Sequence, residues 1–265
     1  MRRVLFVALL AAGLLTAAAT SAVAPTRTPG TLVVALSLPA QGFQVGAVRG
    51  SEVTYARGFE IDLARMIANR LGIPVIRFVS VTDTARLFAS GAKPWDIALA
   101  QIVSTARRGR AVDLSVPYLR VDQAVLLRRG LDRPRALTDL ASLRLCALRG
   151  SRGADVIVSR IRPRVRQLLA RTAEELLRWV QTGRCDAALH EAPTLAALLR
   201  GIRGRFGPLA GRVETEAAYV VALPKGSPLT PEVNRVVVAL RRDGTVSRLA
   251  RRSLAFDPNR LRVLS

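Results

Sequence analysis

Residues 59–79 read FEIDLARMIANRLGIPVIRFV, and this stretch decides the class of fold. Ile61, Ala64 and Ala68 recur at the spacing that puts apolar side chains on one face of a helix. The Gly and Pro that follow are typical of a helix end, and the apolar run Val75–Val79 is typical of a buried strand. A helix followed closely by a buried strand predicts a parallel α/β fold.

Outward from this stretch, short apolar runs recur at intervals that fit alternating strands and helices. Thr31–Leu36 and Ile97–Val103 predict buried strands on either side of the helix–strand unit. The same pattern returns in the second half of the chain, with strands predicted at Leu143–Leu148 and Cys185–Leu189. The chain therefore contains two predicted α/β blocks, followed by a C-terminal part that begins with the apolar run Tyr219–Leu223.

The composition excludes several classes of protein. The chain has 265 residues, half of them hydrophobic, which suffices for one large domain or two lobes and excludes a disordered chain. Its 41 basic residues against 19 acidic ones give a formal net charge of +22, but the arginines are spread evenly, without a basic stripe interleaved with aromatic residues. One histidine and two cysteines leave no cluster for a metal site. We therefore expect no nucleic-acid partner, no metal and no cofactor.

The first residues predict export. Met1–Arg3 is basic, Val4–Ala19 is apolar, and the small residues Ala22–Ala24 follow, which is the layout of a signal peptide over residues 1–24. An uncleaved membrane anchor is the alternative interpretation of the same segment. The sequence has no other apolar run of 18 residues, so we expect a protein that is periplasmic or extracellular after cleavage.

Motifs along most of the chain carry a family resemblance. They are Gly58–Arg65, Trp95–Ala100, Thr105–Arg108, Val112–Tyr118, Leu137–Leu140, Leu145–Ser151, Gly183–Ala187, Tyr219–Gly226 and Arg242–Thr245. In this order and spacing they resemble the extracellular solute-binding proteins of family 3, which deliver polar amino acids to ABC importers. Each motif alone is a weak signal, whereas the ordered set covers about residues 31–257.

The resemblance implies an α/β, two-lobed fold of the periplasmic-binding-protein type II. Each lobe is expected to be a mostly parallel sheet flanked by helices. The first lobe would take residues 31–119 plus 218–265, and the second would take residues 124–212. Two crossover hinge segments, near Tyr118–Gln123 and Val213–Ala218, would join the lobes, and a small ligand would bind between them.

The resemblance also implies a function: an exported protein that captures a small polar solute, an amino acid or a related carboxylate. It would deliver this ligand to an ABC permease in the inner membrane, act as a monomer and have no enzymatic activity. An enzyme on the same scaffold is one alternative, dehydratase-like, with Glu191 as the acid beside His190. An accessory or sensory solute-binding module is another.

Five residues of the first lobe are candidates for ligand contacts. Arg108 matches the family arginine that clamps the ligand carboxylate with two parallel hydrogen bonds. Val103 stands where a hydroxyl side chain commonly contacts that carboxylate, so its backbone N–H would serve instead. Thr84 replaces a frequent aromatic or apolar wall, and Gln101 completes the set. Phe43, in the predicted loop 38–58, either covers the ligand side chain or packs in the core.

The second lobe contributes three candidates. Glu191 stands where the family usually has an aspartate that binds the ligand ammonium group, and its extra methylene moves the carboxylate by roughly 1.5 Å. Ser151 matches a loop that completes the carboxylate site. Arg152 replaces a small polar residue; it either points to solvent or adds a second cation to the site, which would favour an acidic or dicarboxylate ligand.

Two cysteines lie in strands that the resemblance makes neighbours in the second lobe. Because export places Cys146 and Cys185 in an oxidising compartment, we expect a disulfide between them. Buried free thiols are the alternative, should the two Cα atoms lie too far apart for the bond.

Overall fold

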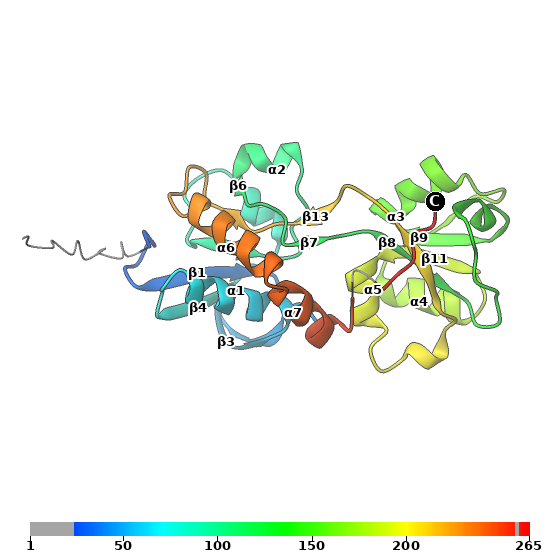
Figure 1. Cartoon of the computed structure of the whole chain (residues 1–265), viewed down its shortest axis with the longest axis horizontal. Coiled ribbons are helices and arrows are strands. Elements are labelled where there is room, and N and C mark those ends of the chain that lie inside the picture. The colour runs from blue at the N-terminus through cyan, green and yellow to red at the C-terminus, as the bar shows by residue number, and fades with distance from the viewer. Residues whose placement is uncertain (1–23, 258–259) are drawn as a thin grey trace, which may run out of the picture.

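Two sheets lie at opposite ends of the molecule in the computed structural model, which describes residues 24–257 and 260–265 (Figure 1). The first sheet and its helices form the first lobe. Its seven strands are, in order across the sheet, β2 (Val45–Arg49), β3 (Glu52–Arg57), β4 (Val75–Ser80), β1 (Thr31–Leu36), β5 (Ile97–Leu99), β14 (Ala222–Leu223) and β6 (Asp113–Leu114).

Apolar faces hold the helices of the first lobe in place. Ile61, Ala64 and Ala68 are buried, which confirms the helix face predicted from their spacing. The helix that carries them packs against the two C-terminal helices of the chain. The helices of this lobe are α1 (Phe59–Arg70), the 3-10 helix η1 (Thr84–Phe88), α2 (Ala106–Ala111), α6 (Thr230–Arg242) and α7 (Thr245–Leu254).

The second lobe has a five-stranded sheet that is covered on both faces. Because successive side chains of a strand alternate between the faces, Val125 and Leu127 lie in one buried cluster, and Ala124 and Leu126 lie in another. Across this sheet the strands are β10 (Leu168–Ala170), β9 (Leu145–Leu148), β11 (Ala187–Glu191), β8 (Gln123–Leu127) and β12 (Leu209–Val213). The helices are η2 (Leu137–Ser142), α3 (Arg152–Val156), η3 (Ile157–Ile161), α4 (Ala173–Gln181), α5 (Ala192–Leu198) and η4 (Arg203–Arg205).

Both sheets are mixed, whereas mostly parallel sheets were expected. The strands β4, β1 and β5 pair in parallel, and so do β10, β9 and β11. A hairpin of β2 and β3 occupies the predicted loop 38–58 and turns at Gly50, whose φ of +63° favours glycine. In addition, β8 follows the first crossing into the second lobe, and β14 follows the second crossing back into the first lobe. Both strands run antiparallel to their neighbours.

Two short strands connect the lobes. β7 (Leu119–Arg120) pairs antiparallel with β13 (Ala218–Tyr219), and the pair lies between the two large sheets (Figure 1). Beyond it, the Val121 N–H donates to the Ala217 carbonyl at 2.9 Å, so that both crossing segments run side by side. The lobe boundaries inferred from the sequence stay a prediction.

The last residues of the chain lie on the second lobe, although residues 218–265 were expected to belong to the first lobe. After α7 the chain reaches the second lobe, where Val263 forms a parallel bridge with Arg212. Leu264 is fully buried among the apolar residues of that lobe, and the Leu137 N–H donates to the Ser265 carbonyl at 3.2 Å. The C-terminus therefore lies on the second lobe (Figure 1), held there by the burial of an apolar side chain.

The predicted export segment, residues 1–24, lies outside the described residues except for Ala24. Within the part of the chain that the structure describes, no helix has the length and hydrophobicity that a bilayer crossing requires. The prediction of a signal peptide therefore rests on the sequence alone.

A disulfide links a strand of the second lobe to a bend. Cys146 on β9 is bonded to Cys185, which lies two residues before β11 rather than in the strand expected from the sequence, and their Cα atoms are 6.1 Å apart. Both residues are fully buried. The structure thus contains the bond expected for an exported protein.

Removing this disulfide tests its contribution to stability. We expect the Cys146→Ala/Cys185→Ala double variant to lose about 2–4 kcal/mol of unfolding free energy, because the bond restricts the unfolded chain. Urea unfolding followed by circular dichroism measures the difference. Reductant should destabilise the wild type and leave the double variant unchanged. Two reactive thiols in the urea-denatured, unreduced wild type would contradict the disulfide.

Candidate ligand-binding site

Arg108 lies on the first turn of α2, in the first lobe. The helix begins after Thr105, whose side-chain oxygen accepts the Arg108 N–H at 3.2 Å. The Arg108 Nη1 atom donates to the Val103 carbonyl at 2.7 Å, and the guanidinium carbon lies 4.9 Å from the centroid of the Phe88 ring. These contacts fix the guanidinium, and its other N–H groups have no partner within the described residues.

A pocket of about 550 Å³ opens beside this guanidinium, between η1 and α2. Its lining includes Thr84 and Arg108, so the structure brings these two predicted residues together. Phe88, four residues after Thr84, supplies the aromatic wall that the threonine cannot. Phe88 was not among the residues predicted from the sequence; its position in the same short helix, four residues after Thr84, is the signal that could have found it.

Glu191 ends β11 in the second lobe, and two hydroxyl groups hold its carboxylate. Its Oε2 atom accepts from the Tyr219 hydroxyl at 2.5 Å and from the Thr194 hydroxyl at 3.3 Å. Burial raises the pKa of Tyr219 well above its ordinary value, and the Glu191 carboxylate raises it further. The phenol therefore keeps its proton and donates to Glu191 at neutral pH.

Arg108 and Glu191 interact electrostatically from opposite lobes. Burial lowers the pKa of the Arg108 guanidinium, and the Glu191 carboxylate acts in the opposite direction. Arginine stays charged at neutral pH even so. No direct salt bridge forms between these two residues, both of which belong to the described part of the chain.

Phe43 belongs to an aromatic cluster beneath this site. It is 1% exposed and meets the rings of Phe59 and Tyr219 edge-on, at centroid distances of 5.9 and 5.8 Å. Tyr118 completes the cluster against both of these rings. This location corresponds to the core-packing alternative for Phe43; a ligand contact by its ring stays a prediction.

Gln101 is held through its backbone by a buried acid. Its N–H donates to the Glu60 carboxylate at 2.8 Å, and its φ is +50°. The Tyr118 hydroxyl and the Gln44 amide also donate to Glu60, which is fully buried. Burial raises the pKa of Glu60, and these hydrogen bonds oppose the rise. The network anchors the strand end that leads to Val103.

Ser151 and Arg152 lie at the N-terminus of α3. The Ser151 hydroxyl accepts the Ala154 N–H at 3.2 Å and caps the helix. Arg152 is exposed and has no hydrogen bond or ion pair with any described residue. The structure does not bring this pair into contact with Arg108; a ligand contact by either residue stays a prediction.

Two polar residues beside Glu191 complete the second-lobe half of the site. The His190 Nδ1 atom accepts the Glu191 N–H at 2.7 Å, and burial lowers the pKa of His190. Gln123 lies opposite Glu191 in the strand register and is 1% exposed, with its amide nitrogen unpaired. Gln123 was not among the residues predicted from the sequence. A glutamine at the start of an otherwise apolar strand is the signal that could have identified it as a site residue.

The arrangement suits the binding of a small zwitterion. The Arg108 guanidinium of one lobe and the Glu191 carboxylate of the other interact electrostatically, and these groups match the carboxylate and the ammonium of an amino acid. Among the described residues, no group of three or more His, Cys, Asp or Glu side chains is placed to hold a metal ion.

Solved structures with a similar fold are amino-acid-binding proteins. An ancestral cationic amino acid solute-binding protein superposes with a TM-score of 0.66 at 24% identity, covering 85% of this chain and 96% of that one. A substrate-binding protein of an amino acid ABC transporter from Streptococcus pneumoniae, bound to L-arginine, gives 0.62 at 22% identity, with 85% and 95% covered. These similarities confirm the α/β, periplasmic-binding-protein type II fold.

Sequence comparisons extend the relationship. The chain is 28% identical over 216 residues to the membrane-bound lytic murein transglycosylase F of Pseudomonas putida, covering 76% of this chain and 44% of the relative. It therefore spans less than half the length of the curated relatives it matches. The model of the bacterial extracellular solute-binding proteins, family 3, matches residues 48–255. The chain belongs to this family.

Proposed function

We propose that this solute-binding protein captures an amino acid, or a related small carboxylate, between its two lobes. Arg108 would bind the ligand carboxylate with the N–H groups that the Val103 carbonyl leaves free. Glu191, oriented by Tyr219, would bind the ammonium group. Closure of the lobes would bring both contacts onto the ligand at once, so that affinity favours the closed form.

The observation that carries this proposal is the opposition of Arg108 and Glu191. Each charge is partly withdrawn from water and oriented by a neighbour, yet the two do not neutralise each other directly. A partly buried charge is costly unless it is paired, so a ligand with both charges gains from both sites. Two proteins of similar fold, an ancestral arginine-binding protein bound to glutamine and the Streptococcus pneumoniae protein bound to L-arginine, agree with this class of ligand.

Delivery to an ABC permease, after export to the periplasm or the cell exterior, is part of the proposal and rests on family membership. A second candidate is a sensory or accessory module that serves another partner. The match to part of a murein transglycosylase favours this candidate. Uptake of the radiolabelled ligand by cells lacking the gene separates the two, because only a transport component lowers uptake when deleted.

Enzymatic use of Glu191 with His190 has less support. One Glu191 oxygen already accepts from Tyr219 and Thr194, and the His190 Nδ1 atom accepts a backbone N–H. Turnover of each candidate solute, followed by NMR, tests this alternative directly. Consumption of a solute that also binds would replace the binding proposal by an enzyme.

The direct test of the proposed function is a thermal-shift screen of amino acids, dicarboxylates and amines. A ligand of micromolar affinity at millimolar concentration stabilises the fold by about 4 kcal/mol. Isothermal titration calorimetry then measures the affinity of each hit. If no member of the panel raises the melting temperature, the proposal fails.

Arg108 is the residue whose loss should matter most. We expect Arg108→Ala to weaken binding of the best amino-acid ligand at least about thirtyfold, because one partner of a desolvated charge pair is removed. Arg108→Lys should recover part of the loss, since it keeps the charge without the planar fork. Calorimetric titration measures both variants. Arg110→Ala, an exposed arginine of the same helix, is the matched control and should bind like the wild type. Equal affinities of the wild type and Arg108→Ala would refute the assignment.

The lowered pKa of His190 predicts a pH dependence. The folded-state pKa lies below the ordinary 6.5. The neutral imidazole therefore makes its full contribution to the stability of the fold above pH 6.5. This contribution is lost as the pH falls from there through the folded-state pKa. We expect melting temperature and ligand affinity to decline together in this range, because protonation removes the Nδ1 acceptor for the Glu191 N–H.

A matched variant isolates this titration. His190→Asn keeps an acceptor oxygen near the position of Nδ1 and does not titrate between pH 5 and 8. We expect its melting temperature to vary less with pH over this range than that of the wild type, measured by differential scanning calorimetry. An equally steep decline in both proteins would assign the acid sensitivity to other groups.

A further inference from the structure

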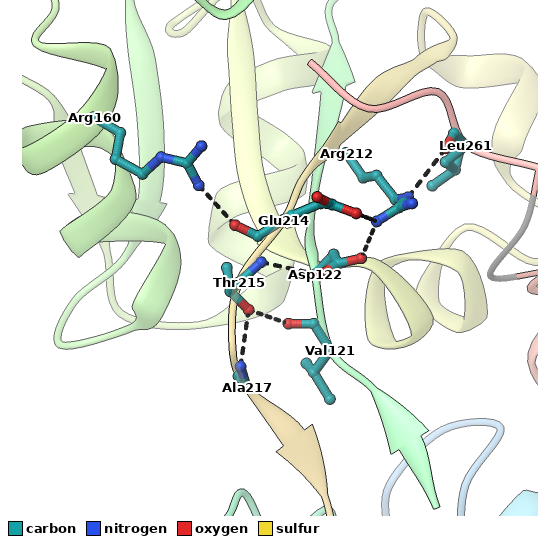
Figure 2. Close-up of polar contacts among 8 residues, drawn as sticks. All are labelled: Val121, Asp122, Arg160, Arg212, Glu214, Thr215, Ala217 and Leu261. Atoms are coloured by element: carbon teal, nitrogen blue, oxygen red, sulfur yellow. Dashed lines mark hydrogen bonds and ion pairs between the residues drawn. The ribbon is translucent and has the colours of Figure 1, made fainter. Parts of the chain in front are cut away.

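Three segments of the chain meet at Arg212, at the end of β12. Figure 2 shows its guanidinium between the carboxylates of Asp122 and Glu214, beside the C-terminal segment at Leu261. We call Asp122, Arg212, Glu214, Thr215 and the segment 261–265 the hinge clamp. Asp122 belongs to the first crossing between the lobes, and Glu214 and Thr215 belong to the second crossing. The C-terminal segment is the third segment that meets at Arg212.

The side chain of Arg212 contacts two carboxylates, of which Asp122 is largely shielded from water and Glu214 is half-exposed. It forms an ion pair with Asp122, donates to Glu214 at 3.0 Å, and donates through Nε to the Leu261 carbonyl at 3.1 Å. The side chains of Arg212 and Asp122 are 17% and 8% exposed. Ion pairs with low exposure and several hydrogen bonds hold their geometry far better than surface pairs.

The backbone of Arg212 holds the C-terminal segment through a parallel β-bridge to Val263. Its N–H donates to the Arg262 carbonyl, and its carbonyl accepts the Leu264 N–H, both at 2.8 Å. Gly211 lies so close to this segment that a Cβ atom there would be 2.8 Å from the Arg262 carbonyl oxygen and from Leu264 Cγ. Together with the buried Leu264 side chain, these contacts dock the end of the chain against β12.

The hinge clamp is also connected to the proposed ligand site. The Asp122 carboxylate accepts the Thr215 N–H at 3.0 Å, and the Thr215 hydroxyl donates to the Val121 carbonyl at 2.8 Å, which ties the two crossings together. The Asp122 carbonyl accepts the Ala192 N–H at 2.8 Å, directly beside Glu191. The position of Glu191 therefore depends on a residue that Arg212 holds.

We propose that Arg212 is a positioning residue of this binding protein, and that the C-terminal segment is a third connection between the lobes, locked to both hinge crossings by Arg212. The clamp sets the resting angle between the lobes and the place of Glu191. This inference rests on the proposed function, since it concerns closure on an amino acid. A connection that restricts the open lobes reduces the conformational entropy that closure costs, so the clamp favours binding.

Two variants and one matched control test the clamp. Arg212→Gln removes the charge that holds Asp122 and Glu214, and deletion of residues 261–265 removes the third connection. Arg262→Gln changes an exposed side chain of the same segment, whose backbone contacts remain. Spin labels at Arg178→Cys and Arg235→Cys, exposed positions on α4 and α6, report the distance between the lobes by double electron–electron resonance without ligand.

We expect a wider distribution of interlobe distances in Arg212→Gln and in the deletion, and an unchanged distribution in Arg262→Gln. Arg212→Gln and the deletion should also bind L-arginine, L-glutamine or L-glutamate, whichever the wild type binds, about three- to thirtyfold more weakly. This is the range for residues that act on a site without touching the ligand. Arg212→Lys, which keeps the charge facing Asp122, should recover part of both effects. Circular dichroism selects variants that remain folded.

The outcomes separate this inference from the proposed function. Folded variants with the distance distribution of the wild type would overturn the clamp, and so would an equal widening in Arg262→Gln. If the wild type binds no member of the panel of amino acids, dicarboxylates and amines, the proposed function fails, while the ligand-free distances still decide whether the clamp exists.

Discussion

The hydrogen bond from Tyr219 to Glu191 crosses from the hinge strand of one lobe to the last strand residue of the other. Tyr219 also pairs with Val103 through a backbone bridge, and the Val103 carbonyl holds Arg108. Its ring packs on Phe43 in the first-lobe core. One buried residue thus contacts both halves of the site, the Glu191 carboxylate through its side chain and the Val103 segment that holds Arg108 through its backbone.

Neutral neighbours orient the two charges of the site without pairing them. The Arg108 guanidinium stacks on Phe88, which orients it without neutralising it, and Glu191 accepts hydrogen bonds from neutral hydroxyl groups rather than from a cation. Neutral partners orient a charge while leaving most of its field directed outward. In the proposed function, a site built in this way would attract a ligand of mixed charge and discriminate against apolar solutes.

The family relationship limits what can be transferred to this chain. One scaffold occurs in amino-acid-binding proteins and in part of a murein transglycosylase, so the fold does not decide the activity. The family resemblance implies that Glu191 and Thr84 differ from the residues usual at these positions, and Thr84 lines the pocket that Phe88 also lines. The C-terminal segment on the second lobe adds a connection that the two-hinge description of the fold lacks.

Local patterns in the sequence determined the α/β blocks, the apolar face of α1 and, through ordered motifs, Arg108 and Glu191 as candidates. These signals arise within one or two turns of a helix or one strand, where periodicity and capping act. The tertiary structure alone decided the Tyr219–Glu191 contact, the stacking of Phe88 and the hinge clamp. Asp122 and Arg212 are separated by 90 residues, and no local pattern in the sequence encodes a contact that forms only when distant strands meet.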